Sequence, residues 1–561
     1  VNLLIYTGGA KKWHIKEINS NENAIYKVYN DTLEKKTSFD KKSMGDPNTL
    51  KEFLDYCYDN YKDETTTFNL ILWDHGGGPM LGYGSDEYYK YDLLTIEDLT
   101  EALKKSKFNT NQKLGFIGFD ACLMSSIEVA HALSTYANYM VASEEQEPGN
   151  GWYYYFLKEI NHNTEIKDVG KEIIDKFMKI NDLYGLEDLS LALIDLEKVD
   201  KIENKMNSLF ETMEDDYSIE YSQISRSRSK AKSYGKSGSS LGYDLVDLYN
   251  LIENLPIKYK DRANDLKNAI DEAVIYIGTN LANTHGLSVY FPYELKKSID
   301  NYLEVYSNFN FAEEYTNYIK RFAGTLTGKR EYEWDFSTTK PIEQDGKITL
   351  SITDEVRDNY SSAAYILFEK KDEYYTPIFM GKDVELNGNT LETSISNKYI
   401  VAKNKTETVG LMALENTDEI GYTKYIIPGN VQRWTDDDNF NFEIQNVYFS
   451  FVVNNEYPNG KLVGATVVAN EDELASKKNI NIEEWKTIQL MSFKYKIFDE
   501  KGQYTSKWES SPEVLGFETK TNEDFTIEFE QLNPDKEYYA LFKIKDNQGN
   551  VSYSNVIKVK L

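Results

Sequence analysis

Two apolar runs in the first quarter of the chain stop at residues that can carry out chemistry. The run 68–73 stops just before His75, which three glycines follow, and the run 114–119 stops just before Cys122. Each run has the length of a buried strand and is closed by turn-forming residues, which predicts two strands of a sheet. Ligands bind at the carboxyl ends of strands in open α/β sheets, so we expect both residues at a binding edge.

Strands and helices alternate over the first 200 residues. The predicted strands there cover about 1–6, 68–73, 114–119, 139–143 and 189–196, and the predicted helices about 50–61, 95–105, 127–133 and 173–180. This alternation predicts an α/β domain with a mostly parallel sheet that helices cover on both faces. Helices dominate from about 196 to 323. They are interrupted by the basic Ser/Arg/Lys/Gly segment 225–240, which we expect to be a solvated, flexible loop. One last apolar strand, 287–291, is predicted among the later helices.

The pattern changes near residue 324. From there to Leu561, short alternating strands are separated by turns rich in Asp, Asn and Gly. Residues 532–539 resemble the late-strand region of fibronectin III or Ig-like domains. We therefore predict an α/β domain over 1–325 and one or two all-β sandwiches, divided into 330–429 and 430–561.

Composition narrows the function classes. The net charge of −29 argues against a nucleic-acid binder, which needs clustered Lys and Arg. The two cysteines, Cys57 and Cys122, provide no disulfide framework, and Cys57 lies on the apolar stripe of the first predicted helix, where we expect an inert core thiol. No apolar run reaches the roughly 18 residues of a transmembrane segment. No signal peptide is visible, and the start at Val1 suggests that a targeting segment was removed.

Cys122 and His75 together suggest nucleophilic catalysis. A free thiol with a pKa of about 8.5 is mostly protonated at neutral pH, so it needs a base such as His75. The amides of a helix predicted to start near Cys122 would also favour negative charge on sulfur. Because glycine lets the backbone approach a substrate carbonyl, the N–H groups of Gly76 and Cys122 are candidate oxyanion donors. His131 and His285 are weaker candidates for the base, since neither combines a strand end with a glycine loop.

Two rival hydrolase classes lack their motifs. A His-Gly-Gly-Gly loop also occurs in lipases and esterases, but these need a Gly-x-Ser-x-Gly elbow, which the chain does not contain. His-Glu-x-x-His is absent too, and the five histidines are scattered without metal-ligand spacing. A serine esterase and a zinc hydrolase are therefore disfavoured.

Four motifs, in this order, resemble those of the clostripain family of cysteine peptidases, in the caspase-like clan. They are Trp73–Gly78, Phe119–Met124, Ala142–Trp152 and Gly286–Pro292, within a resemblance that covers about residues 2–322. The resemblance implies a caspase-like fold and a catalytic dyad of His75 and Cys122. Their separation of 47 residues compares with about 50 in caspases.

The resemblance also implies protein or peptide substrates cleaved after Arg or Lys. Asp120, two residues before the cysteine, would shape the pocket for the basic P1 side chain by pairing with it. The alternative is that Asp120 only caps the helix predicted after it. Asn150 stands where some relatives supply a second pocket acid, so the resemblance implies a less strict preference for Arg or Lys.

Members of this family are commonly secreted, need Ca²⁺ and cut themselves between the histidine and the cysteine. We therefore expect a secreted or cell-surface protein of bacterial type. Lys90 is the candidate self-cleavage site, and Asp86 and Glu87 are weak candidates for Ca²⁺ ligands because their oxygens are hard donors.

These observations favour an endopeptidase that acylates Cys122 and hydrolyses the thioester. Its β domains would position it on a substrate, a cell wall or a host surface, or act as plain spacers. The alternative is a catalytically silent surface or adhesion protein whose β domains bind a partner. A silent relative often loses one dyad residue, and this chain keeps both.

Overall fold

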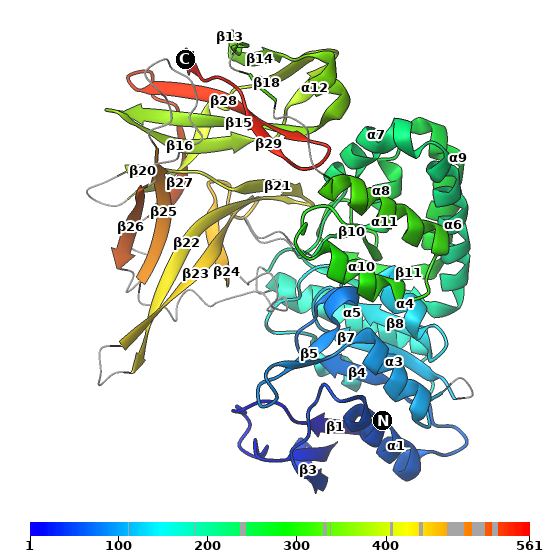
Figure 1. The fold of residues 1–561 in the computed structure, drawn as a ribbon. Coiled ribbons are helices and arrows are strands. Elements are labelled where there is room, and N and C mark those ends of the chain that lie inside the picture. The colour runs from blue at the N-terminus through cyan, green and yellow to red at the C-terminus, as the bar shows by residue number, and fades with distance from the viewer. Residues whose placement is uncertain are drawn as a thin grey trace.

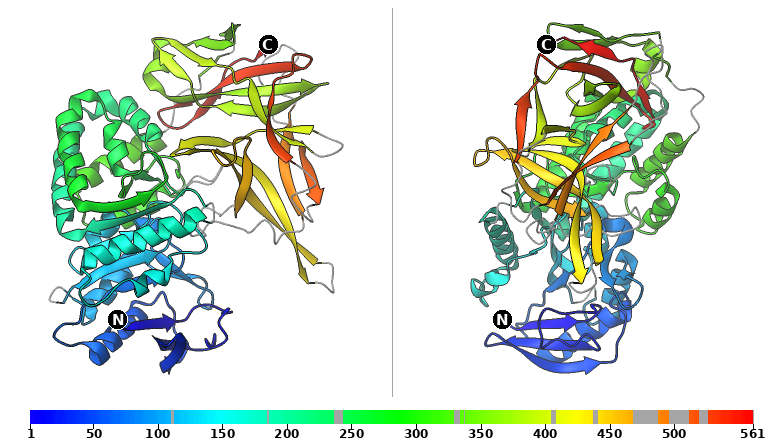
Figure 2. Two further views of the ribbon diagram at one scale, coloured as in Figure 1. Left: turned by 180° about the vertical axis from the view of Figure 1, so that it is seen from behind. Right: turned by 90° about the vertical axis from the view of Figure 1, so that its left-hand side faces the viewer.

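The computed structural model shows an α/β part and a β part that lie side by side (Figure 1). It describes residues 1–109, 112–183, 186–235, 243–328, 334–336, 338–403, 408–436, 441–467, 487–495, 511–518 and 526–560. The amino terminus lies at the far end of the α/β part and the carboxyl terminus in the β part, which all views show (Figure 2).

A five-stranded sheet forms the centre of the α/β part, in the order β11-β9-β8-β7-β4. Its strands are β4 (Leu70–Trp73), β7 (Leu114–Asp120), β8 (Ala137–Ala142), β9 (Ser190–Asp195) and β11 (Val274–Thr279). The first three are parallel neighbours, β9 is antiparallel to β8, and β11 is antiparallel to β9. Only β9 therefore runs against the others, and the predicted α/β class is confirmed.

Helices cover both faces of this sheet. Successive strand residues point to opposite faces: Phe116 packs in a cluster with α5 (Ile166–Leu183) and η1 (Tyr154–Lys158), and Ile117 in the larger cluster with α3 (Ile96–Lys105) and α4 (Ile127–Leu133). The predicted helix starts are marked by caps. Asp46 caps α1 (Pro47–Tyr61), and Thr95 forms a capping box at the start of α3.

The remaining elements extend the two ends of the α/β part. A separate antiparallel sheet at the amino end contains β1 (Leu3–Thr7), β2 (Asn23–Tyr29) and β3 (Thr32–Phe39). The others are α2 (Gly78–Leu81), β5 (Tyr83–Asp86), β6 (Asp92–Leu94), η2 (Leu196–Lys198), α6 (Val199–Asp215), α7 (Tyr217–Lys230), β10 (Leu245–Asp247), α8 (Leu248–Glu253), η3 (Ile257–Tyr259), α9 (Lys260–Ala273), β12 (Ser288–Tyr290), α10 (Ile299–Ser307) and α11 (Glu313–Thr327).

The basic segment is not the flexible loop that its composition suggests. Residues 225–230 are the last turns of α7, and Arg228 is only 1% exposed. Its guanidinium donates to the Asp244 carboxylate (3.1 Å) and to the Phe291 carbonyl (3.0 Å). A buried partner converts this arginine from a solvated charge into a packing residue. Residues 236–242 of the segment lie outside the described residues.

The β part consists of several packed antiparallel sheets. Its elements are β13 (Ile342–Gln344), β14 (Lys347–Ser351), α12 (Asp354–Asn359), β15 (Tyr360–Lys371), β16 (Tyr374–Gly381), β17 (Glu385–Asn387), β18 (Thr390–Ser394), β19 (Lys398–Lys403), β20 (Thr408–Leu411), β21 (Glu415–Glu419), β22 (Tyr422–Asp436), β23 (Asn441–Asn454), β24 (Lys461–Val467), β25 (Thr487–Lys494), β26 (Ser511–Glu518), β27 (Thr526–Gln531), β28 (Glu537–Asp546), β29 (Val551–Tyr553) and β30 (Ile557–Val559).

Strand pairing corrects the expected division between residues 429 and 430. That boundary lies inside β22, which pairs with β23 along its length. β15 pairs with β28, and β19 pairs with β27, so the first β unit is closed by strands from the end of the chain. The sheet that contains β21 to β26 is thus inserted between two halves of the first unit. Alternating residues predict a strand but not its partner, which explains the error.

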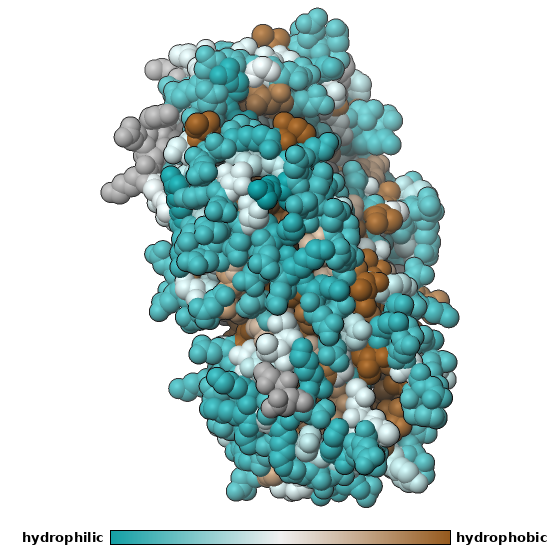
Figure 3. Space-filling model, turned by 90° about the vertical axis from the view of Figure 1, so that its right-hand side faces the viewer, coloured by the Kyte–Doolittle hydropathy of each residue, from teal (hydrophilic) through white to brown (hydrophobic). Residues whose placement is uncertain are grey.

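The helical side of the molecule has a mainly hydrophilic surface, as expected for a chain in which 28% of the residues are charged (Figure 3). Apolar side chains on the face shown in Figure 3 lie in small separate patches. In the part of the chain that the structure describes, no helix has both the length and the apolar content to cross a bilayer.

Candidate active site

The register of β4 and β7 brings His75 and Cys122 to adjacent strand ends. Trp73 lies opposite Asp120 in this parallel pair, so both candidates follow their paired residues by two positions. Gly76 is buried and packs on the Cys122 peptide: a Cβ on Gly76 would lie 2.0 Å from the Cys122 carbonyl oxygen. The structure therefore places the two predicted catalytic positions side by side.

Hydrogen bonds fix the backbone of His75 at its N–H and at its carbonyl. The Asp74 carboxylate accepts hydrogen bonds from the His75 N–H (2.7 Å) and the Ser85 N–H (3.3 Å), and the His75 carbonyl accepts one from the Gly84 N–H (3.0 Å). The half-buried ring keeps Nδ1 without a hydrogen-bond partner among the described residues. A fixed backbone with a ring nitrogen available for a proton suits a general base.

Cys122 is fully buried and contacts the segment 144–148. Its Sγ accepts a hydrogen bond from the Glu147 N–H (3.3 Å), and the next residue, Leu123, has a left-handed backbone (φ +65°). The helix expected to start near Cys122 begins only at Ile127, because Leu123 and the following turn delay it. The amide beside the sulfur is thus that of Glu147, and helix amides do not serve this role.

Asp120 is not a helix cap. The cap of α4 is Ser126, whose hydroxyl accepts from the Val129 N–H (3.3 Å). The fully buried Asp120 carboxylate instead accepts hydrogen bonds from the Trp152 N–H (3.1 Å) and the Tyr154 hydroxyl (3.0 Å). Asp120 therefore faces the segment that follows β8.

That segment also contains Asn150. Asn150 is exposed, and the next residue, Gly151, has a φ of +61° and packs on Asp120, where a Cβ would lie 2.5 Å from Oδ1. Asn150 thus precedes the residue that packs on Asp120, but only the Asp120 side chain is buried.

Three residues of the site had no role assigned from the sequence: Glu147 and Trp152, which lie in the motif Ala142–Trp152, and Tyr154. The Trp152 indole N–H donates to Glu147 Oε1 (3.1 Å) while its backbone N–H donates to Asp120, so Trp152 joins two buried carboxylates. Burial and the neighbouring Asp120 raise the pKa of the Tyr154 hydroxyl, which stays a donor. The signal that pointed to this segment was the motif Ala142–Trp152.

The candidates between the dyad residues lie on the β5–β6 hairpin. Lys90 is at its exposed tip, in a left-handed conformation (φ +59°). Asp86 is buried, and its carboxylate accepts from the N–H groups of Met44 and Tyr88 (both 2.9 Å). The Glu87 carboxylate accepts from the Lys11 N–H. These hydrogen bonds hold the loop, and the role of Asp86 and Glu87 as Ca²⁺ ligands stays a prediction.

No group of three or more His, Cys, Asp or Glu that could hold a metal is found among the described residues.

The other candidates for the base have structural partners. His131 lies beside Glu203 (3.2 Å), and His285 pairs with Asp247 (2.9 Å) while stacking on Tyr249 at 4.3 Å. Cys57 is buried in α1, and burial raises its pKa to about 12, in agreement with an inert thiol.

Comparisons with known proteins give a family match that covers the α/β part. A sequence model of the clostripain family matches residues 1–336. Clostripain of Hathewaya histolytica is 25% identical over 322 residues, which are 46% of this chain and 59% of that protein. The match thus spans about 59% of that relative's length.

Solved structures give matches of low identity. A secreted C11 cysteine protease from Bacteroides thetaiotaomicron, in complex with an irreversible peptide inhibitor, is 18% identical with a TM-score of 0.43, over 55% of this chain and 88% of that chain. An inactive zymogen C11 protease from Parabacteroides distasonis is 22% identical with a TM-score of 0.39, over 55% of this chain and 85% of that chain.

Proposed function

The chain belongs to the clostripain family, and from this premise we propose that it is a cysteine endopeptidase with Cys122 as nucleophile and His75 as base. The observation that carries the proposal is the pairing of Trp73 with Asp120 between the parallel strands β4 and β7. This pairing sets His75 and Cys122 at neighbouring strand ends. The close packing of Gly76 on the Cys122 peptide supports it.

The proposed reaction proceeds through a thioester. His75 takes the proton from Sγ of Cys122, and the thiolate attacks the carbonyl carbon of the scissile bond. The N–H groups of Gly76 and Cys122 donate to the oxygen that becomes negative. The protonated His75 then gives its proton to the leaving amine, and water, deprotonated by His75, hydrolyses the thioester and regenerates the thiol.

Burial of Cys122 sets a requirement for activation. Cys122 is fully buried and its sulfur accepts a hydrogen bond from the Glu147 N–H, so a peptide reaches it only after a local rearrangement. We propose a cut at Lys90 as the activating event, since this residue lies at an exposed hairpin tip between the dyad residues.

We propose a basic P1 residue for the substrate. Asp120 offers a buried carboxylate at the same strand end as Cys122, and such a carboxylate pairs well with guanidinium or ammonium. Asn150, exposed and uncharged, adds no second negative charge. We expect Arg and Lys to be accepted with less discrimination than a site with two acids would give.

Secretion and Ca²⁺ dependence are also part of the proposal. The Bacteroides thetaiotaomicron protein is described as secreted, and we propose a secreted or cell-surface location for this chain too. The calcium requirement rests on the family resemblance, and Asp86 and Glu87 remain the proposed ligands. The alternative of a silent surface protein is disfavoured because both dyad residues are retained at adjacent strand ends.

The decisive experiment compares wild type with Cys122→Ala and His75→Ala. Each protein is tested on reporter peptides that end in Arg, Lys or Asp, with Ca²⁺ and with a chelator. We expect cleavage after Arg and Lys by wild type only, and full activity in the control Cys57→Ala, which removes the inert thiol. Equal cleavage by wild type and Cys122→Ala would end the cysteine-peptidase proposal.

A further inference from the structure

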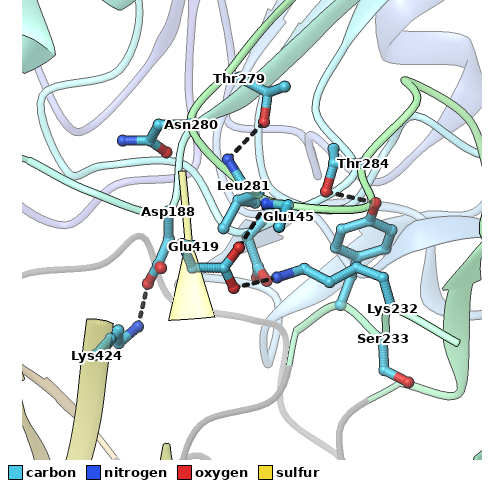
Figure 4. A network of polar contacts seen from close by, with 12 residues as sticks. Glu145, Asp188, Lys232, Ser233, Thr279, Asn280, Leu281, Thr284, Glu419 and Lys424 are labelled. Carbon is cyan, nitrogen blue, oxygen red and sulfur yellow. Dashed lines mark hydrogen bonds and ion pairs between the residues drawn. The ribbon is translucent and has the colours of Figure 1, made fainter. Parts of the chain in front are cut away.

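One carboxylate of the β part is buried in the α/β part. Glu419, at the end of β21, is 3% exposed in its side chain. One oxygen accepts from the Lys232 ammonium (2.6 Å) and the other from the Ala282 N–H (2.6 Å), as Figure 4 shows. Glu419 therefore joins two segments of the α/β part that are 50 residues apart in sequence.

The first segment leads from Lys232 to the loop of the catalytic cysteine. Three residues after Lys232, the Gly235 N–H donates to Glu145 Oε1 (3.1 Å). The Glu145 carbonyl accepts from the N–H of Leu123 (3.2 Å), the residue that follows Cys122. Gly235 has a φ of +69° and packs on Leu123, where a Cβ would lie 3.0 Å from Cδ1. The backbone from Lys232 to Gly235 and two hydrogen bonds through Glu145 thus connect Lys232 with Leu123.

The second segment leads from Ala282 to the neighbouring carboxylate. The Gly286 N–H donates to Glu144 Oε2 (2.7 Å), and the Gly286 carbonyl accepts from the Ser125 hydroxyl (2.7 Å). The two segments are also linked to each other, because the Tyr234 hydroxyl donates to Thr284 Oγ1 (3.0 Å). The first path therefore reaches the Cys122 loop through Glu145 and Leu123, and the second reaches it through Gly286 and Ser125.

Further contacts hold the β21–β22 hairpin in place. The buried Asp188 carboxylate accepts from the Tyr422 hydroxyl (2.8 Å) and pairs with the Lys424 ammonium. The Ile420 N–H donates to the Asn280 carbonyl (3.2 Å), two residues before Ala282. Figure 4 shows the Asp188–Lys424 pair near Glu419. Glu419 is thus presented by a hairpin that is itself fixed to the α/β part.

We propose that Glu419 is a positioning residue for Cys122, so that docking of the β part completes the catalytic centre. This inference rests on the proposed peptidase function and assigns the β part a role beyond substrate or surface binding.

Loss of Glu419 is expected to disturb the Cys122 loop because the side chains around Glu419 are poorly exposed to water. Lys232 is 15% exposed in its side chain, so removal of Glu419 leaves a poorly solvated ammonium and an unpaired amide. The two segments then relax, and the Cys122 loop loses the support that sets its geometry. A change in geometry affects the chemical step more than the binding of a short substrate.

The test uses the full chain and three variants. Glu419→Leu removes both hydrogen bonds, Glu419→Gln keeps an acceptor without the charge, and Lys232→Met breaks one segment only. Lys403→Met is the matched control, since Lys403 pairs with Glu528 and Glu530 inside the β part. Melting temperatures identify any variant that does not fold, and Glu419→Gln and Lys232→Met keep the test valid if Glu419→Leu fails to fold.

Two readouts separate positioning from stability. For Glu419→Leu we expect kcat on a short reporter peptide to fall about tenfold, with KM changed by less than about twofold, since misplacement acts on the chemical step. For Lys232→Met and Glu419→Gln we expect kcat values between those of Glu419→Leu and wild type. For Lys403→Met we expect the wild-type kcat. In a Cys57→Ala background, Cys122 of Glu419→Leu reacts more slowly with iodoacetamide and with a shifted pH profile.

The outcomes distinguish this inference from the proposed function. A folded Glu419→Leu with wild-type kcat, or a higher one, overturns the positioning role while Cys122→Ala remains inactive. Cleavage by Cys122→Ala overturns the peptidase proposal itself, whatever Glu419 does.

Discussion

Gly76 and Cys122 are in direct main-chain contact. A Cβ on Gly76 would lie 2.0 Å from the Cys122 carbonyl oxygen and 3.0 Å from its nitrogen, distances at which the backbone must move. We predict that Gly76→Ala lowers kcat/KM about 100-fold or more, because it displaces a candidate oxyanion donor.

The matched control for this change is Gly324→Ala, in α11, where a Cβ meets nothing within 4 Å. This control should keep wild-type activity. Near-wild-type kcat/KM in Gly76→Ala would show that the contact can relax without affecting catalysis.

Asp120 is predicted to determine the preference for basic residues. Asp120→Asn keeps the shape but removes the charge, so kcat/KM for Arg and Lys substrates should fall roughly 10- to 100-fold, the equivalent of about 1.5–3 kcal/mol for a hydrogen bond to a charged group. Cleavage of a reporter with neutral citrulline at P1 should change much less. The measurement is kcat/KM for the three reporters.

Two variants refine this prediction. Tyr154→Phe removes a hydroxyl donor from Asp120 and leaves the charge, so it should keep the preference for Arg over citrulline. Asn150→Asp adds a second acid and should strengthen that preference. An equal loss on charged and neutral substrates in Asp120→Asn would mean that Asp120 only holds the segment 150–154.

Lys90 is predicted to be cut by the peptidase itself. The residue is exposed at the hairpin tip, but its left-handed backbone must become extended before a peptidase can bind it. N-terminal sequencing of the activated protein should therefore give a new chain that starts at Tyr91. Lys90→Gln and Cys122→Ala should remain uncut.

The control for this prediction is Lys104→Gln, which removes an exposed lysine from α3 and should be processed like wild type. An uncut chain with full activity would contradict the role of Lys90.

Glu187 is predicted to make stability depend on pH at the contact between the two parts. Burial and the neighbouring Asp188 raise the pKa of Glu187 from its usual 4.5 to about 7, while Asn454 and Lys424 act in the opposite direction. The folded state therefore binds the proton more tightly than the unfolded state. Stability is highest when Glu187 is protonated and falls as the pH rises from about 4.5 to about 7.

Melting temperatures between pH 4 and pH 8 test this prediction, with pH intervals chosen around that window. Glu187→Gln should remove part of the fall, and Glu197→Gln, at an exposed position, should leave it unchanged. The same pH dependence in wild type and Glu187→Gln would assign the effect to another group.

The local features of this protein follow from its sequence. Alternating and helical patterns predicted the strands that end before His75 and Cys122, and Asp46 and Thr95 mark the starts of α1 and α3. These features depend on interactions between residues close in sequence, such as caps, turns and the periodic burial of one face. The candidate dyad could be chosen for the same reason, because each member ends a recognisable run.

Only the tertiary structure decided which distant segments meet. The pairing of β15 with β28, the Glu147 amide on the Cys122 sulfur and the reach of Glu419 between Lys232 and Ala282 join residues 25 or more positions apart. Nothing in the local pattern at Glu419 distinguishes it from a surface carboxylate. Its role arises because the fold removes it from water and supplies two donors, and that depends on the packing of the whole chain.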